Sequence, residues 1–177
     1  MRESLKCWML TICGAALGAT LCVASAEATP PSGFAATTMA LGRLERLDVS
    51  TRALLPDGGV KESTRNLWLS FQRTSGPSDL YVQSNVWAPG GSTGWHTHPG
   101  HSLIVVTEGV ITAYEGDDPT CTPQVYAAGM GFVDPGGSHV HVLRNEGRVE
   151  ARTIAVQLLP VGAARRIDAT ASSNCPF

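Results

Sequence analysis

The sequence is poor in charged and aromatic residues. Asp, Glu, Lys and Arg make up 16% of its 177 residues, and Phe, Trp and Tyr make up 6%. The 13 Lys and Arg residues form no basic stripe, which argues against a nucleic-acid partner. After residue 26, no segment shows the long apolar period of 3.6 residues that a helix requires, so a helical domain is also disfavoured.

The only long apolar run lies at the start of the chain. Two basic residues precede an apolar stretch over residues 8–24, and the small residues Ala24 and Ala26 stand where a signal peptidase requires them. We predict that residues 1–26 are a signal peptide and that the mature protein is secreted or periplasmic, with no stable membrane span. A retained membrane anchor is the alternative, but two glycines interrupt the run.

Cysteine is scarce once the signal is removed, because only Cys121 and Cys175 remain. Exported proteins meet oxidising conditions, so this pair predicts a disulfide rather than two unpaired thiols. The bridge would attach a C-terminal tail, residues 161–177, to a loop near residue 121.

What the mature chain does contain is a regular series of short strands and turns. Residues 27–40 are rich in Pro, Ala and Thr and are predicted to be a flexible leader. Residues 41–160 are predicted to form one domain, since no internal repeat or second domain is visible. Many short strands at such spacing favour an all-β sandwich or small barrel.

Two segments illustrate the strand pattern. In "NLWLSFQR", residues 66–73, apolar and other side chains alternate, which predicts a half-buried strand. The strands "SLIVV" and "VITAY" flank Thr107-Glu108-Gly109, which we interpret as a tight hairpin turn.

All five histidines lie in two short clusters, "GWHTHPGHS" at residues 94–102 and "GGSHVHVLRN" at residues 136–145. Residues i and i+2 of a strand face the same side, so each H-x-H pair can direct two imidazoles at one ion. His96 and His98 form one pair, and His139 and His141 form the other. The alternative, that these are ordinary surface or core histidines, fits a single histidine better than two such pairs.

The two clusters resemble the two motifs of the cupin superfamily. In "GWHTHPGHSLIVVTEG" a glycine leads to H-x-H and later to a second glycine, and "GMGFVDPGGSHVHVLRN" carries Gly129, Pro135, Gly137, His141 and Asn145. The resemblance covers roughly residues 80–160. It implies a single jelly-roll β-barrel that is often a homodimer.

The resemblance implies that His96, His98 and His141 bind one divalent transition metal, which could be Fe, Mn, Ni, Cu or Zn. This chain departs from the family pattern in two places. Ser102 occupies the position of the usual glutamate ligand, and an extra residue in the second motif makes His139 a competing ligand. A neutral three-histidine site, a four-histidine site that includes His101 or His139, and a barrel without metal remain open.

Two functions remain open at this point. The first is a metal-dependent enzyme, with dioxygenase chemistry as the leading hypothesis, that acts on a small anionic organic substrate with His101 or His139 moving protons. The second is a non-catalytic barrel that binds a small ligand or a metal. Asp134-Pro135 is interpreted as turn chemistry.

Overall fold

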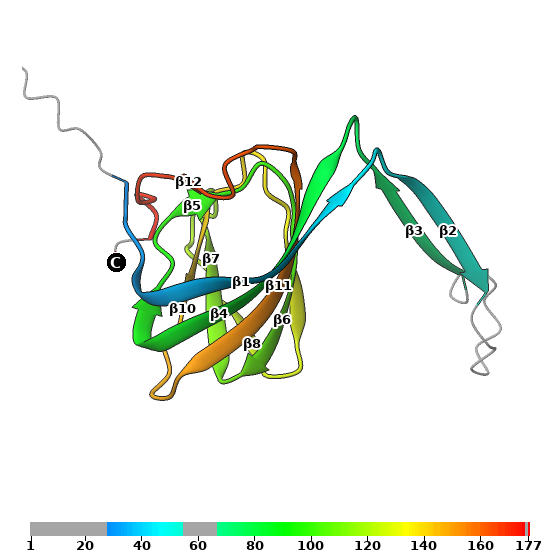
Figure 1. Ribbon diagram of the computed structural model, residues 1–177. Helices are drawn as coiled ribbons and strands as arrows, with labels where there is room; N and C mark the ends of the chain where they lie inside the picture. Colours follow the sequence, from blue (N-terminus) through cyan, green and yellow to red (C-terminus); the bar gives the residue numbers. More distant parts are fainter. Residues whose placement is uncertain (1–27, 55–66, 176) are drawn as a thin grey trace, which may run out of the picture.

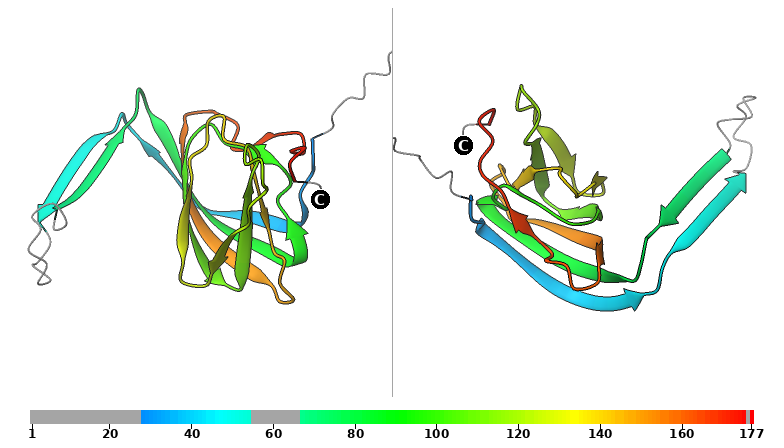
Figure 2. Two further views of the ribbon diagram at one scale, coloured as in Figure 1. Left: turned by 180° about the vertical axis from the view of Figure 1, so that it is seen from behind. Right: turned by 90° about the horizontal axis from the view of Figure 1, so that it is seen from above.

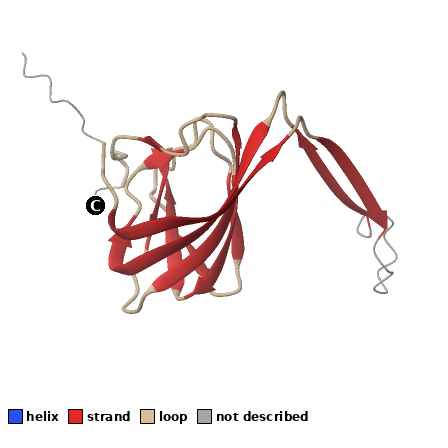
Figure 3. Cartoon of the chain, viewed as in Figure 1, coloured by secondary structure: helices blue, strands red, loops and turns tan. Residues whose placement is uncertain are grey.

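The computed structural model describes residues 28–54, 67–175 and 177, and all regular secondary structure in these ranges is β-strand (Figure 3). Within this part of the chain, no helix is present that could cross a lipid bilayer. The signal peptide predicted for residues 1–26 lies outside the described residues.

Ten antiparallel strands form a jelly-roll barrel, which confirms the predicted all-β fold (Figure 1). The larger wall has the order β1-β4-β11-β6-β9, with bounds β1 Ser32–Leu44, β4 Ser78–Ser92, β11 Ala151–Pro160, β6 Ser102–Glu108 and β9 Gly131–Asp134. The smaller wall has the order β12-β5-β10-β7-β8, with bounds β12 Ile167–Asp168, β5 His96–Thr97, β10 His141–Arg144, β7 Val110–Glu115 and β8 Gln124–Ala127. The walls meet where Arg144 pairs with Ser92.

Strand β1 replaces most of the predicted flexible leader. Residues 32–40, assigned to that leader from their composition, belong to β1, whose register with β4 runs from Ser32 opposite Ser92 to Leu44 opposite Ser78. Phe34 also packs on Trp87, with ring centroids 4.8 Å apart. The free edge of β4 supplies these backbone partners, and composition alone could not reveal it.

Strands β2 (Asp48–Leu54) and β3 (Leu67–Arg73) pair with each other and form a hairpin arm that projects from the barrel (Figures 1 and 2). The strand predicted over residues 66–73 is therefore present, but its half-buried character is wrong. Phe71 is 72% exposed and Leu69 is 48% exposed. Alternation of apolar side chains predicted the strand correctly. The strand is exposed because it lies in the arm, where no barrel wall covers either of its faces.

The predicted hairpin at residues 107–109 is also wrong. β6 pairs with β9 and β11, whereas β7 pairs with β8 and β10. Gly109, with φ of +69°, instead carries the chain from one wall to the other. A Cβ on Gly109 would lie 2.7 Å from the carbonyl oxygen of Glu150, so the crossing has room only for glycine.

The space between the walls is filled at one end by an apolar core of Trp87, Val106, Ile111, Ala113, Leu143 and Ala151. The C-terminal tail lies along the smaller wall, where β12 pairs with β5. The predicted disulfide between Cys121 and Cys175 is confirmed, with Cα atoms 5.3 Å apart. Cys175 is buried against Trp95, so the bridge attaches the tail to a second apolar cluster.

Candidate metal centre

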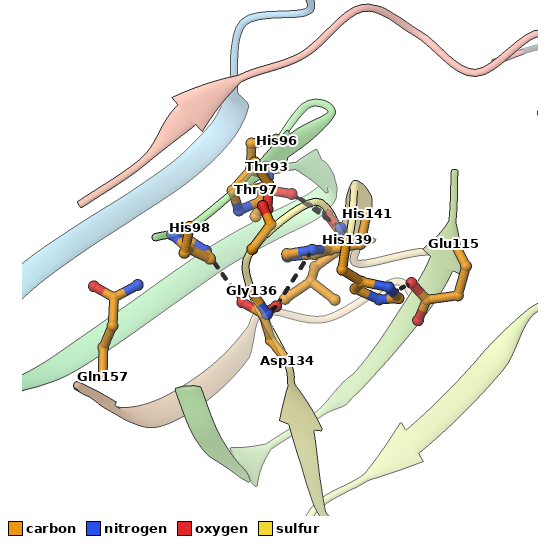
Figure 4. Close-up of polar contacts among 12 residues, drawn as sticks. Thr93, His96, Thr97, His98, Glu115, Asp134, Gly136, His139, His141 and Gln157 are labelled. Atoms are coloured by element: carbon orange, nitrogen blue, oxygen red, sulfur yellow. Dashed lines mark hydrogen bonds and ion pairs between the residues drawn. The ribbon is translucent and has the colours of Figure 1, made fainter. Parts of the chain in front are cut away.

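Three of the five histidines converge inside the barrel (Figure 4). His96 lies in β5, His98 follows two residues later, and His141 opens β10 directly opposite His96 in the sheet register. One nitrogen from each ring lies within 4.8 Å of the other two. The predicted convergence of separate strands on one point is confirmed, and these histidines are placed for metal binding.

Backbone carbonyls hold two of the rings in place. His96 donates from Nδ1 to the carbonyl oxygen of Gly94 at 2.8 Å, and His98 donates from Nδ1 to the carbonyl oxygen of Arg165. A carbonyl can only accept, so Nδ1 carries the proton in both rings. Nε2 of each neutral ring therefore keeps a free lone pair, which is the arrangement found in metal-ligating histidines.

Burial keeps the imidazoles of His96 and His141 neutral. It lowers the pKa of His96 to about 2, and the neighbouring His141 lowers it further. Burial also lowers the pKa of His141 to about 4, although the nearby Asp134 carboxylate opposes that change. Because only a neutral imidazole can bind a metal ion, the site is ready for metal at physiological pH.

Tight turns set the position of the histidines. Gly94 has φ of +67°, and a Cβ there would lie 2.1 Å from the carbonyl oxygen of Thr29. Thr29 in turn accepts a hydrogen bond from the backbone N–H of Trp95 at 2.6 Å. The strand β5 that carries His96 is therefore held against the N-terminal segment.

The histidines face a cavity of about 290 Å³. Ser102 and Ile104 line it together, because alternate residues of a strand face the same side, and Leu143 lines it beside His141. Seven polar atoms of the lining have no hydrogen-bond partner among the described residues: Gln83 Nε2, Trp87 Nε1, Asp134 Oδ2, His141 Nδ1, Gln157 Oε1, Arg165 Nε and Arg166 Nη2. Four of these, on Gln83, Trp87, Arg165 and Arg166, are donors, so the cavity can receive a small molecule with acceptor atoms.

His101 and His139 lie apart from this cavity lining. His139 belongs to the turn before β10, and its Nε2 pairs with the carboxylate of Glu115. The second H-x-H pair therefore does not lie on one strand, which is why His141 joins the cluster and His139 does not. His101 offers its backbone carbonyl to the N–H of Leu158. Proton transfer by His101 or His139 remains a prediction.

Asp134 is the residue of the site that sequence reasoning missed. Its Oδ1 accepts a hydrogen bond from the N–H of Gly136 at 2.9 Å, so the turn interpretation is confirmed. The same carboxylate is 4% exposed, lies 3.3 Å from His98 Nε2 and lies 3.6 Å from His141 Nδ1 (Figure 4). The dipeptide Asp134-Pro135 indicated a turn, but it did not indicate that the Asp134 side chain points into the cavity.

Comparison with known proteins shows what the barrel is similar to. A family model described as a cupin domain matches residues 86–157. An oxalate oxidase solved with glycolate is 26% identical, with 44% of this chain and 41% of that chain covered and a TM-score of 0.39. A cupin domain from Bordetella pertussis Tohama I is 21% identical, with 46% and 82% covered and a TM-score of 0.39.

The polyketide cyclase RemF from Streptomyces resistomycificus is 19% identical, with 54% of this chain and 63% of that chain covered and a TM-score of 0.45. The chain thus matches less than half the length of the oxalate oxidase. A search of curated protein sequences finds no significant match.

Proposed function

Since residues 86–157 match the model of a cupin domain, we propose that this chain is a cupin and an exported, metal-dependent oxidoreductase of the dioxygenase type that acts on a small anionic organic substrate. The observation that carries the proposal is the convergence of three imidazoles on a cavity with unpaired donors. Cys121–Cys175 supports the extracytoplasmic location, because disulfides persist in oxidising compartments.

His96, His98 and His141 would hold one divalent ion such as Fe, Mn, Ni, Cu or Zn. When bound, that ion would supply redox and Lewis-acid chemistry. The chain's own contribution is to fix the ligands. The carbonyls of Gly94 and Arg165 keep two rings in the tautomer that leaves Nε2 free.

The cavity residues favour an anionic substrate. Arg165 is held by a hydrogen bond to Thr38 and by stacking of its guanidinium over Tyr81 at 4.6 Å, yet its Nε has no partner among the described residues. Arg166 and Gln83 add further unpaired donors. A carboxylate can accept these donors in pairs, while Ile104 and Leu143 exclude water from the apolar side.

The first test is metal content together with oxygen uptake. We expect the purified mature protein to carry about one equivalent of a redox-active metal by elemental analysis. It should also consume oxygen with at least one member of a panel of small mono- and dicarboxylic acids. His96→Gln should lose most of the metal and the oxygen uptake, because it removes one of three ligands. His101→Gln, outside the cavity, is the matched control and should retain the metal.

Two results would contradict this proposal in different ways. An unchanged metal content in His96→Gln would reject the site itself. A stoichiometric metal without oxygen uptake across the panel would favour the second function, a non-catalytic barrel that binds a small ligand or a metal.

A further inference from the structure

We propose that Asp134 is the fourth protein ligand of this metal and replaces the glutamate that the family motif places at Ser102. The inference rests on the proposed function, since it concerns the same ion. It differs from all three alternatives left open by the sequence, because the carboxylate would come from the neighbouring strand instead of being absent.

The sheet register brings the two positions together. Ser102 of β6 pairs directly with Asp134 of β9, and both side chains line the cavity that the histidines face. Opposed residues of an antiparallel pair have Cβ atoms about 4.5–5.5 Å apart on the same face. The short Ser102 side chain, only 3% exposed, leaves the space that a longer ligand from β6 would occupy. Asp134 reaches the same space from one strand away.

The geometry of the carboxylate fits that of a ligand. Asp134 Oδ2 lies 3.3 Å from His98 Nε2, the ring nitrogen left free by the Arg165 carbonyl. Two ligand atoms about 2.1 Å from one ion lie roughly 3.0–3.4 Å apart at bond angles of about 90–109°. Oδ2 is also buried and has no hydrogen-bond partner among the described residues. Oδ2 therefore lies where an oxygen ligand beside His98 should be.

The other carboxylate oxygen of Asp134, Oδ1, is already held by a hydrogen bond. Asp134 Oδ1 accepts the N–H of Gly136, which leaves Oδ2 as the oxygen that can bind an ion. The turn after Asp134 is joined to the first histidine motif, since the N–H of Gly137 donates to the carbonyl oxygen of His98 at 2.6 Å. Thr97 Oγ1 donates to the carbonyl oxygen of Gly137 at 2.8 Å. These bonds hold the carboxylate and His98 in one rigid unit.

Charge gives an independent reason. Asp134 is the only carboxylate among the residues that line the cavity, and its ion-pair contacts in the described part of the chain are to histidines alone. Asp134 is buried, and a buried carboxylate without a cationic partner is costly. A divalent cation between Asp134 and the imidazoles would supply the missing positive charge.

The test is titration of the metal-free protein with Zn²⁺ in competition with a chelator, followed by visible spectroscopy with Co²⁺. Asp134→Asn should weaken Zn²⁺ binding by at least ~100-fold, more than the loss of a group that only supports a ligand. It should also change the d–d bands of bound Co²⁺. Ser102→Ala is the matched control on the facing strand and should change neither. Moving the carboxylate in the double variant Ser102→Glu/Asp134→Asn should restore affinity.

The outcomes separate the two proposals. A Co²⁺ spectrum that is the same in Asp134→Asn and in the wild type would overturn the assignment of Asp134 as a ligand, whatever the change in affinity. The metal-dependent function would then stand on three histidines. A wild-type protein that binds neither ion would overturn both proposals. Thermal unfolding of each metal-free variant shows whether a variant that does not bind the ion is still folded. Asp134→Glu is measured in the same way as a second substitution at this position.

Discussion

At the scale of the residue, Asn145 shows how the second motif maintains the barrel. Its side chain is 1% exposed and donates from Nδ2 to the carbonyl oxygens of Trp87, Ala88 and Val149, at 3.1, 3.2 and 2.7 Å. Its Oδ1 accepts the N–H of Gly147 at 3.0 Å. Asn145 thus ties the loop after β10 to the end of β4, and its role is structural.

Asn145→Asp should therefore destabilise the protein. The substitution removes the donors and places a carboxylate against three carbonyl oxygens in a buried position. We expect a loss of about 3 kcal/mol in the free energy of unfolding, measured by urea denaturation. The control is Asn174→Asp at an exposed position. Equal urea midpoints for the two variants would show that the network around Asn145 contributes little.

The residues of the site were predictable to different degrees. His96, His98 and His141 could be predicted because a pair of histidines two residues apart is rare, and its chemistry is specific. Asp134 could not, because an aspartate before proline occurs in many turns and its cavity-facing orientation depends on the pairing of β9 with β6. The cross-strand position opposite Ser102 becomes visible only once the register is known.

At the scale of the element, strands were easier to predict than their partners. The segments "SLIVV" and "VITAY" were predicted as strands and lie in β6 and β7, and in β6 alternate residues are buried. The sequence pattern could not show that they belong to opposite walls, because a tight turn and a crossing turn both favour glycine at position 109. Strand pairing is a long-range property, and a short segment does not encode it.

The C-terminal tail is the element that links the disulfide to the metal centre. Cys175 anchors the tail, β12 pairs with β5, and the carbonyl oxygen of Arg165 accepts the Nδ1 proton of His98. Residues 121 and 175 are separated by 54 positions. Loss of the bridge should therefore affect both stability and the orientation of His98.

We expect the double variant Cys121→Ser/Cys175→Ser to lose about 4 kcal/mol of unfolding free energy, by the chain-entropy model for a loop of this length. Zn²⁺ affinity in chelator competition should fall by roughly 10-fold, because the partner of His98 becomes less ordered. Wild-type protein with its bridge intact, measured in the same denaturant series, is the reference. An unchanged Zn²⁺ affinity in the folded variant would show that β12 holds Arg165 without the bridge.

At the scale of the whole molecule, the barrel and the arm are separable. In the described residues, β2 and β3 pair only with each other, whereas β1 and β4 continue the barrel wall as far as Leu44 and Ser78. The arm exposes Trp68, Leu69 and Phe71 and buries none of the cavity residues. An isolated two-stranded hairpin contributes little stability by itself.

The base of the arm allows a clean deletion. The N–H of Thr74 donates to the carbonyl oxygen of Leu47 at 3.0 Å, and the N–H of Leu47 donates to Thr74 Oγ1 at 2.9 Å. Leu47 and Thr74 are therefore already paired across antiparallel strands. An Asn-Gly dipeptide in place of residues 48–73 would close them with a two-residue turn whose twist suits a hairpin.

We expect this shortened protein to keep its disulfide. Its Zn²⁺ affinity should stay within about 3-fold and its thermal midpoint within about 5 °C of the full-length values. The reason is that the deletion removes the contacts between β2 and β3 and leaves the barrel strands paired. The measurements are chelator competition and thermal unfolding, with the full-length protein as the control. A shortened chain that folds but loses Zn²⁺ would mean that the arm supports the metal centre. That result would contradict the separation of the molecule into a barrel with the candidate metal centre and an independent arm.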